Sequence, residues 1–280
     1  MPGILYVVAT PIGNLEDVTF RAIRVLREVA VIAAEDTRRT ARLLQHYSIS
    51  TPTTSLHEHN ERSRTPSLIS RLTRGESVAL VSDAGTPVVS DPGALLVAAA
   101  HAAGIRVEPV PGPSAALAAV SASGLQAEQV LFVGFPPSRA KARNSWLDSL
   151  RDEPRVIVFF EAPHRIRDTL TDLIAIFGDR IAAIGRELTK VHEELVVAPI
   201  SLHLERLTEP RGEFTVVVSG SDPTRAGHAE LPPLDTLVRE FGELTKTRPG
   251  TRRQIVKDLA EKYGVKAREM YQLLESAKEN

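Results

Sequence analysis

The sequence predicts an α/β protein of two domains, followed by a small helical domain. In the first part of the chain, apolar runs of strand length alternate with segments of helical period, as is typical of helices layered on a parallel sheet. From Leu131 onward, fewer helices separate the strands, which favours a second domain of α+β type. A length of 280 residues has room for about two domains of ordinary size.

The first domain is expected over residues 1–112. Its strands are predicted at 4–9, 31–34, 78–81 and 107–110, and its helices at 19–29, 37–46, 60–73 and 92–103. Thr19 is expected to cap the first of these helices, and Pro92 to lie in the first turn of the last one.

The second domain is expected over residues 113–220. Its strands are predicted at 130–135, 155–160, 180–186, 195–198 and 213–218, and its helices at 114–123, 140–150 and 163–177. The single tryptophan, Trp146, has Leu147 and Leu150 as helical neighbours. We therefore expect it to pack inside this domain rather than to stack on a base.

Residues 221–233 are rich in Gly, Pro and polar residues and are predicted to be a linker. Residues 234–280 are expected to form a basic helical domain resembling a helix-turn-helix, with helices at 253–263 and 266–278. Between residues 246 and 268, eight Lys and Arg stand against two acids. This excess predicts a module that binds phosphate groups, although solvated charge on a surface helix would give the same pattern.

Composition excludes several classes of protein. The net charge of −1 creates no global attraction to nucleic acid, so any such affinity must be local. The absence of cysteine excludes disulfides, thiolate nucleophiles and zinc sites with Cys ligands. No apolar run approaches the ~18 residues of a membrane span, and the amino terminus lacks the basic start of a signal peptide. We expect a cytoplasmic protein that does not contact membranes.

Three predicted strands end in turns of Gly and Pro, at residues 9–14, 83–87 and 111–115. If these strands are parallel neighbours, their turns meet in one crevice at the carboxyl edge of the sheet. The turns lack the spacing of a dinucleotide-binding loop and of a P-loop. Prolines remove backbone donors, whereas Ser82, Asp83 and Ser114 suit a ligand with ammonium, amino and hydroxyl groups. S-adenosylmethionine matches that description.

Eight motifs lie in chain order at residues 5–15, 34–38, 81–87, 91–93, 111–115, 134–135, 160–165 and 186–190. Together they resemble the motifs of the tetrapyrrole methylase superfamily. The motifs at 10–15, 35–38 and 186–190 are similar to the family of methyltransferases that modify small-subunit ribosomal RNA. The resemblance implies a two-domain tetrapyrrole methylase-like fold, a homodimer and S-adenosylmethionine as cofactor. It also implies methyl transfer to the ribose 2'-oxygen of a cytidine in the decoding region of 16S rRNA.

The resemblance further implies which residues touch the cofactor. Pro11 would lie beneath it, Phe160 near the cleft floor, and Leu188 and Thr215 would reach it from the second domain. The loop at its methionine end would consist of Ser82, Asp83, Ala84, Gly85 and Thr86, and the adenosine would lie near Ser114 and Ala115.

Methyl transfer to a hydroxyl requires alignment of the two reactants and a group that accepts or steers a proton. The candidates are Glu35, Asp83, Glu187 and Lys190, of which Lys190 would need a lowered pKa in a closed site. Asp36 and Glu213 are further carboxylates near the same turns. These spacings have another explanation. Glu35 and Asp36 could form ordinary helical ion pairs with the arginines that follow them, and Glu187 could pair in the same way with Lys190. We expect no metal site.

Basic residues at the predicted rim and in the tail are candidates for RNA contacts, with small-subunit 16S rRNA as the partner. They are Arg38, Arg139, Arg165, Arg252, Arg253, Lys257 and Lys266. Two other functions remain open from the sequence. One is methylation of a small tetrapyrrole such as a precorrin, and the other is a ribosome-binding factor without catalytic activity.

Overall fold

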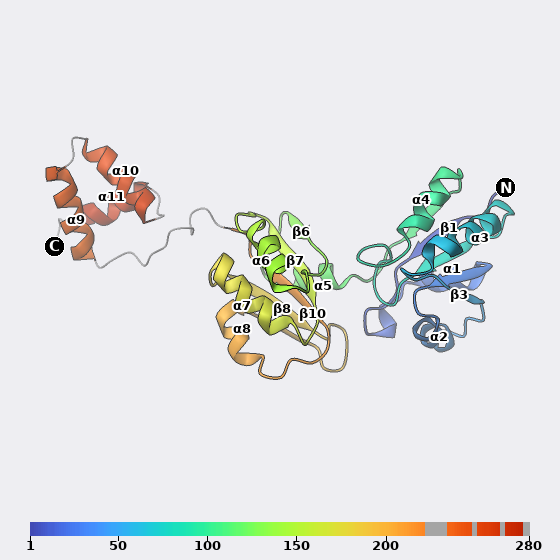
Figure 1. Ribbon diagram of the computed structural model, residues 1–280. Helices are drawn as coiled ribbons and strands as arrows, with labels where there is room; N and C mark the ends of the chain where they lie inside the picture. Colours follow the sequence, from blue (N-terminus) through green and yellow to red (C-terminus); the bar gives the residue numbers. More distant parts are fainter. Residues whose placement is uncertain (222–233, 248–250, 264–266, 277–280) are drawn as a thin grey trace. The chain divides into compact units, whose positions relative to one another are not determined.

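A computed structural model of the chain describes residues 1–221, 234–247, 251–263 and 267–276 (Figure 1). Its internal contacts divide the chain into two compact units. The first unit holds Met1–Asp148 and Val156–Val218, and the second holds Ser149–Arg155 and Ser219–Asn280. The boundary expected at residue 112 falls inside the first unit, between its two sheets, and stays a prediction.

The first sheet of this unit is parallel, with the strand order β3-β2-β4-β1-β5. Its strands are β1 (Leu5–Val8), β2 (Val31–Ala34), β3 (Thr53–Ser55), β4 (Val78–Val81) and β5 (Val107–Val110). The short strand β3 was not predicted. Its three residues are polar and partly exposed at the sheet edge, so they carry no apolar signal.

Four helices cover the two faces of this sheet. Helices α1 (Phe20–Glu28) and α2 (Thr37–His46) share one apolar core, and α3 (Glu61–Thr73) and α4 (Ala94–Ala102) share the other. The residues of β2 alternate between the cores, with Ile32 in the first and Ala33 in the second. Because α1 follows β1 and α4 follows β4, the chain leaves these two neighbouring strands toward opposite faces of the sheet. Ligands of α/β proteins bind at such a point.

The starts of two helices test the capping predictions. Thr19 caps α1 as expected, because its hydroxyl oxygen accepts the Ala22 N–H at 3.1 Å. The position predicted for Pro92 is wrong, since α4 begins at Ala94 with Gly93 as its N-cap. The buried Glu61 carboxylate supplies the cap instead. One of its oxygens accepts the backbone N–H groups of Gly93, Leu95 and Leu96 at 3.0, 2.8 and 3.3 Å.

The second sheet of the first unit has the order β6-β7-β10-β8-β9, with β6 parallel to β7 and the other pairs antiparallel. Its strands are β6 (Val130–Phe132), β7 (Val156–Glu161), β8 (Ile181–Arg186), β9 (Glu194–Pro199) and β10 (Phe214–Val218). Its helices are α5 (Ala115–Ala122), α6 (Ala140–Asp148), α7 (Ile166–Phe177) and α8 (Ile200–Arg206), the last of which was not predicted.

Helices cover this sheet on both faces. Ala119 of α5 packs in one core with Val158 and Val217. Phe159 alternates to the other face, where Trp146 of α6 meets it edge-on with ring centroids 6.4 Å apart. Trp146 therefore packs against the core, as expected.

The second unit contains α9 (Leu234–Thr247), α10 (Arg252–Lys262) and α11 (Ala267–Ser276). The three helices share a core of Leu237, Ile255, Val256, Leu259, Ala260, Tyr263, Met270 and Leu274. Helix α9 precedes the two helices expected here. The turn at 264–266, with Lys266, lies outside the described residues. Within the described part of the chain, no helix combines the length and apolar character needed to cross a bilayer.

Candidate functional site

A cavity of about 850 Å³ in the first unit is lined by residues of both sheets. Its size falls within the range of small-molecule sites, about 300–1,000 Å³. Eleven residues expected at the site line it, namely Glu35, Asp83, Ala84, Gly85, Thr86, Ser114, Ala115, Phe160, Leu188, Lys190 and Thr215. Pro11, Ser82 and Glu187 lie outside its lining.

The turns after β1 and β4 meet at the mouth of the crevice. Thr10 and Gly85 exchange two backbone hydrogen bonds of 2.9 Å, which hold the two loops side by side. Gly85 adopts a φ of +78°, in the left-handed region that favours glycine. Pro11 directly follows Thr10 in the chain. It therefore lies next to the cavity, although it is not one of the residues that line the wall.

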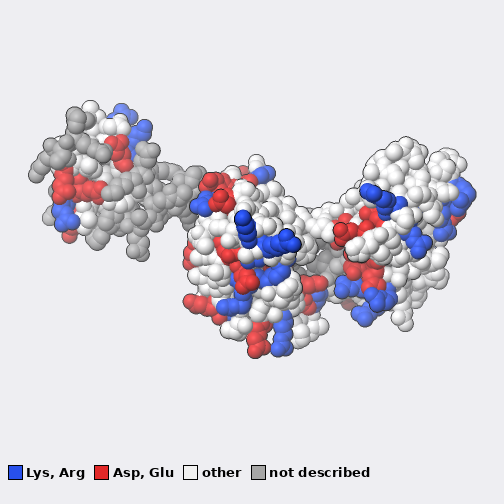
Figure 2. All heavy atoms as spheres, in the orientation of Figure 1, with Lys and Arg blue, Asp and Glu red and all other residues white. Residues whose placement is uncertain are grey.

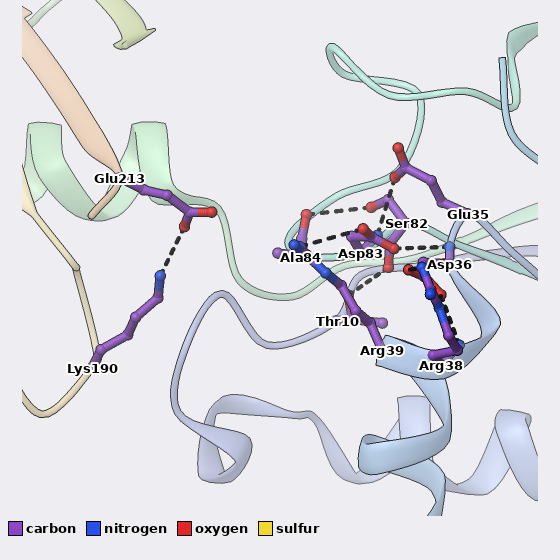
Figure 3. A network of polar contacts seen from close by, with 10 residues as sticks. All are labelled: Thr10, Glu35, Asp36, Arg38, Arg39, Ser82, Asp83, Ala84, Lys190 and Glu213. Carbon is purple, nitrogen blue, oxygen red and sulfur yellow. Dashed lines mark hydrogen bonds and ion pairs between the residues drawn. The ribbon is translucent and has the colours of Figure 1, made fainter. Parts of the chain in front are cut away.

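Three carboxylates gather at one corner of the cavity, those of Glu35, Asp83 and Asp91. Figure 3 shows the first two with Arg39 beside them. Arg39 pairs with Asp83 at 3.3 Å, and the Asp83 backbone N–H donates to Glu35 at 3.3 Å. Burial raises the pKa of the Glu35 and Asp91 carboxyls, and the nearby negative charge of Asp83 adds to this effect. This acidic corner suits a ligand cation.

Lys190 lines another part of the cavity wall, and Glu213 lines it too. The Lys190 ammonium lies 2.8 Å from a carboxylate oxygen of Glu213 and 3.0 Å from one of Glu187 (Figure 3 draws the first contact). Burial lowers the pKa of Lys190, but hydrogen bonds to the two carboxylates outweigh burial, so that pKa is raised. The expectation of a lowered pKa at Lys190 is therefore wrong, and the amine is held as a cation.

Glu187 orients its neighbours rather than facing the cavity. Its carboxylate accepts the Glu213 backbone N–H at 2.8 Å as well as the Lys190 ammonium. These two bonds, the backbone one first, lower the pKa of Glu187. The ion pair considered as an alternative for the Glu187–Lys190 spacing is thus present, and it lies at the cavity wall.

Aromatic rings form an apolar wall of the cavity. The Phe160 ring contacts those of Phe132 and Phe135, with centroids 5.1 and 5.5 Å away. Such rings give a ligand apolar and stacking contacts.

Several lining residues were not among the candidates from the sequence, chiefly Val7, Ile12, Arg39, Val89, Ser90, Asp91, Phe132, Phe135, Glu161 and Phe214. Val7, Ile12, Asp91, Phe135 and Glu161 belong to the quoted motifs, which gave a signal for them. Arg39, Val89, Ser90, Phe132 and Phe214 lie outside those motifs, so no such signal marked them.

The residues expected to contact RNA have different surroundings. Arg38 is exposed and pairs with Asp36 at 2.8 Å, and Arg139 is exposed before α6. Arg165 turns inward, because its side chain is only 20% exposed and pairs at 3.3 Å with the fully buried Glu161 carboxylate. This pairing favours a structural role for Arg165, and its contact with RNA stays a prediction.

In the second unit, Arg253 and Lys257 lie exposed one turn apart on α10. Arg252 places its guanidinium over the Phe241 ring at 5.4 Å, which gives it a packing role as well. Lys266 lies outside the described residues. Among the residues that the structure describes, no cluster of three or more His, Asp or Glu could hold a metal ion.

Comparisons with known proteins agree with this geometry. The family described as Tetrapyrrole (Corrin/Porphyrin) Methylases matches residues 4–202. A protein of Synechocystis sp. named Ribosomal RNA small subunit methyltransferase I is 45% identical over 97% of both chains. A protein of Pseudomonas aeruginosa with the same name is 52% identical over 78% of this chain and 79% of its own. The chain belongs to the tetrapyrrole methylases, in the ribosomal RNA small subunit methyltransferase I family.

Solved tetrapyrrole methylases share the fold. The methyltransferase CobJ superposes with a TM-score of 0.60 at 20% identity, over 78% of this chain and 95% of that one. The uroporphyrin-III-C-methyltransferase of Thermus thermophilus gives 0.54 at 22% identity, over 77% and 94%. The family and the tetrapyrrole methylase-like fold predicted from the motifs are thus confirmed.

Proposed function

We propose that this protein transfers the methyl group of S-adenosylmethionine to the ribose 2'-oxygen of a cytidine in the decoding region of 16S rRNA. The observation that carries the proposal is a cavity between two sheets, lined by eleven of the expected site residues, in a chain whose rRNA methyltransferase relatives match it nearly end to end. The proposal includes a cytoplasmic homodimer that acts on the small ribosomal subunit.

The residues of the cavity fit S-adenosylmethionine. The acidic corner would hold the ammonium of the methionine part, and Arg39 would face its carboxylate. Phe160 and the small residues Ser114 and Ala115 line the cavity and would contact the adenosine. Gly85 lines the cavity and has no side chain, so its backbone would be open to the ligand.

When bound, the cofactor supplies an electrophilic methyl group, and the protein must align a ribose hydroxyl with it. Lys190 is a cation on the cavity wall, so it would orient the ribose or a neighbouring phosphate rather than remove a proton. Glu213 lies 2.8 Å from that ammonium and also faces the cavity, which favours it for steering the leaving proton. Glu35 and Asp83 would then serve the cofactor end.

Transfer of a labelled methyl group tests the proposal. The full-length protein is incubated with labelled S-adenosylmethionine and small ribosomal subunits that lack the modification, and the digested rRNA is analysed by mass spectrometry. We expect label in 2'-O-methylcytidine. Label in a base would refute the ribose assignment, and label in a precorrin but not in rRNA would favour tetrapyrrole methylation. Cofactor binding without any transfer would indicate a non-catalytic ribosome-binding factor.

A further inference from the structure

Helix α2 carries an unusual concentration of positive charge beside the cavity. Its ten residues include three arginines and one histidine and contain no acid. The side chains of Arg38, Arg42, Gln45 and His46 are all exposed. With 3.6 residues per turn, these four positions fall within about 100° of arc on one side of the helix. We refer to these four residues as the α2 stripe.

The stripe begins at the cavity. Arg39, next to Arg38 in the first turn, lines the cavity wall and pairs with Asp83. From Arg38 to His46 the helix rises about 12 Å at ~1.5 Å per residue, so the stripe leads away from the cavity mouth. At its far end, the Arg27 guanidinium of α1 donates to the Tyr47 carbonyl at 2.7 Å and adds another exposed cation. Figure 2 shows Lys and Arg atoms gathered where Figure 1 places α2.

Two arginines in the first turn do not serve the stability of the helix. The amino end of a helix carries partial positive charge, so cations there are unfavourable. Asp36 partly compensates, because its carboxylate caps the helix at the Arg38 N–H and holds the Arg38 guanidinium with bonds of 3.0 and 2.8 Å. That pairing also holds the pKa of Asp36 well below its usual value. Arg42 has no ion pair within the described residues.

We infer that the α2 stripe binds the sugar-phosphate backbone of the RNA substrate next to the target nucleotide. Arg38 and Arg42 would contact phosphates, while Gln45 and His46 would donate hydrogen bonds to phosphate or ribose oxygens. Asp36 fixes one guanidinium before binding, which reduces the entropy lost in the complex. The inference rests on the proposed rRNA substrate, and it assigns a docking surface on the first unit, separate from the basic helices of the second unit.

The test compares full-length variants that differ only in exposed arginines. Arg38→Gln/Arg42→Gln removes both cations of the stripe. Arg106→Gln is the matched control, because Arg106 is 70% exposed, pairs with an acid two residues away at 2.7 Å as Arg38 does, and precedes β5 at the opposite edge of the sheet. Binding of transcribed small-subunit rRNA is measured from 50 to 200 mM salt, and methyl transfer is measured at one salt concentration.

Two phosphate contacts to single-stranded RNA contribute about 1.4 to the slope of log affinity against log salt. We expect the double variant to lose a slope of this size and to need more RNA for half-maximal rate, with kcat, cofactor affinity and melting temperature close to those of the control. A slope equal to that of the Arg106→Gln protein would overturn the inference. Absence of ribose methylation by the unmodified protein would instead refute the proposed function, since the slope comparison requires only RNA binding.

Discussion

The backbone N–H of Asn14 donates a hydrogen bond to the Thr189 hydroxyl, 3.0 Å away, across 175 positions of the chain. Asn14 follows β1 of the first sheet and Thr189 follows β8 of the second, so this bond joins the two sheets beside the cavity. Thr189 and Glu187 adopt positive φ angles of 67° and 50°, a strained conformation for residues with side chains. The contacts around this turn hold it in place and thereby position Lys190.

Gly13 should be essential for this contact between the loops that follow β1 and β8. A Cβ built on Gly13 lies 2.5 Å from the Lys190 Cγ, 2.6 Å from the Thr189 hydroxyl and 3.0 Å from the Leu188 carbonyl oxygen. Gly13→Ala should therefore push the two loops apart, and a displacement of about 1 Å lowers turnover by ~100-fold. Gly242→Ala is the control, because nothing lies within 4 Å of a Cβ built there. Wild-type kcat in a folded Gly13→Ala protein would contradict the positioning role.

Removing the Lys190 ammonium should lower turnover while cofactor affinity changes little. Lys190→Ala takes away the cation that Glu213 and Glu187 hold at the wall, and loss of a group that acts on the reacting hydroxyl costs roughly 100-fold. Glu187→Gln keeps an oxygen that can accept the Glu213 N–H, so its effect should be smaller. Single-turnover rates at saturating RNA measure both. If both variants react at the wild-type rate, neither residue serves the transfer step, and Glu213, which also lines the cavity, has to be tested alone.

The raised pKa of Lys190 determines how its contribution to stability changes with pH. The pKa of Lys190 is raised in the folded protein by its hydrogen bonds to Glu213 and Glu187. The stability that these ion pairs contribute is therefore complete below the ordinary lysine pKa of about 10.4, and it is lost as pH rises through the pKa of Lys190 in the folded protein. Rate profiles between pH 6 and 9 should therefore contain no step that Lys190→Ala removes. A step in this range that disappears in the variant would show that the amine titrates during catalysis.

Glu35 is expected to lower the stability of the protein at neutral pH and to contribute to cofactor binding. Burial raises its pKa, so its favourable contribution is complete below the ordinary glutamate value, about 4.3, and is lost as pH rises through the folded value. At pH 7 the charged, partly buried carboxylate opposes folding. Glu35→Gln should raise the melting temperature at pH 7, with the difference vanishing near pH 4, and should weaken cofactor binding. Thermal melts with the exposed Glu16→Gln as control measure the first effect, and calorimetry the second.

The sequence predicted most of the strands and helices of the fold, because the strands are short apolar runs and the helices between them have apolar residues at helical spacing. β4 illustrates this, since all four of its residues are buried. It did not predict β3, which is polar, or the start of α4, which depends on the Glu61 carboxylate from another helix. Long-range caps of this kind leave no local pattern.

The site shows a similar limit. Motifs located the loops that meet at the cavity, because Gly85 and its neighbours have a distinctive composition. The raised pKa of Lys190 depends on Glu213, 23 positions away, as well as on Glu187, and the Arg165 side chain contacts Pro136, 29 positions away, as well as Glu161. Local spacing allows the pairs with Glu187 and Glu161 but cannot give the two distant contacts, so a lowered pKa was expected at Lys190 where the structure has two ion pairs.

Gly85→Val should abolish cofactor binding. A Cβ has room at this position, but a φ of +78° is disfavoured for a β-branched residue, and the added methyl groups would enter the space between backbone and ligand. Calorimetry should show one S-adenosylmethionine per chain for the unmodified protein and none for the variant. Circular dichroism establishes whether the variant is folded. Unchanged affinity in a folded Gly85→Val protein would refute the assignment of this loop to the cofactor.

The basic residues of α10 should contribute to RNA affinity independently of the catalytic unit. Arg253 and Lys257 are exposed one turn apart, so Arg253→Gln/Lys257→Gln should reduce the salt slope of RNA binding by about 1.4, the value for two phosphate contacts on single strands. Cofactor affinity should not change, because the cavity lies in the other unit. Arg252→Gln provides the comparison, since its guanidinium packs over Phe241 and its loss should lower stability more than RNA affinity. Equal slopes for the double variant and the unmodified protein would mean that these two cations are ordinary solvated surface charge.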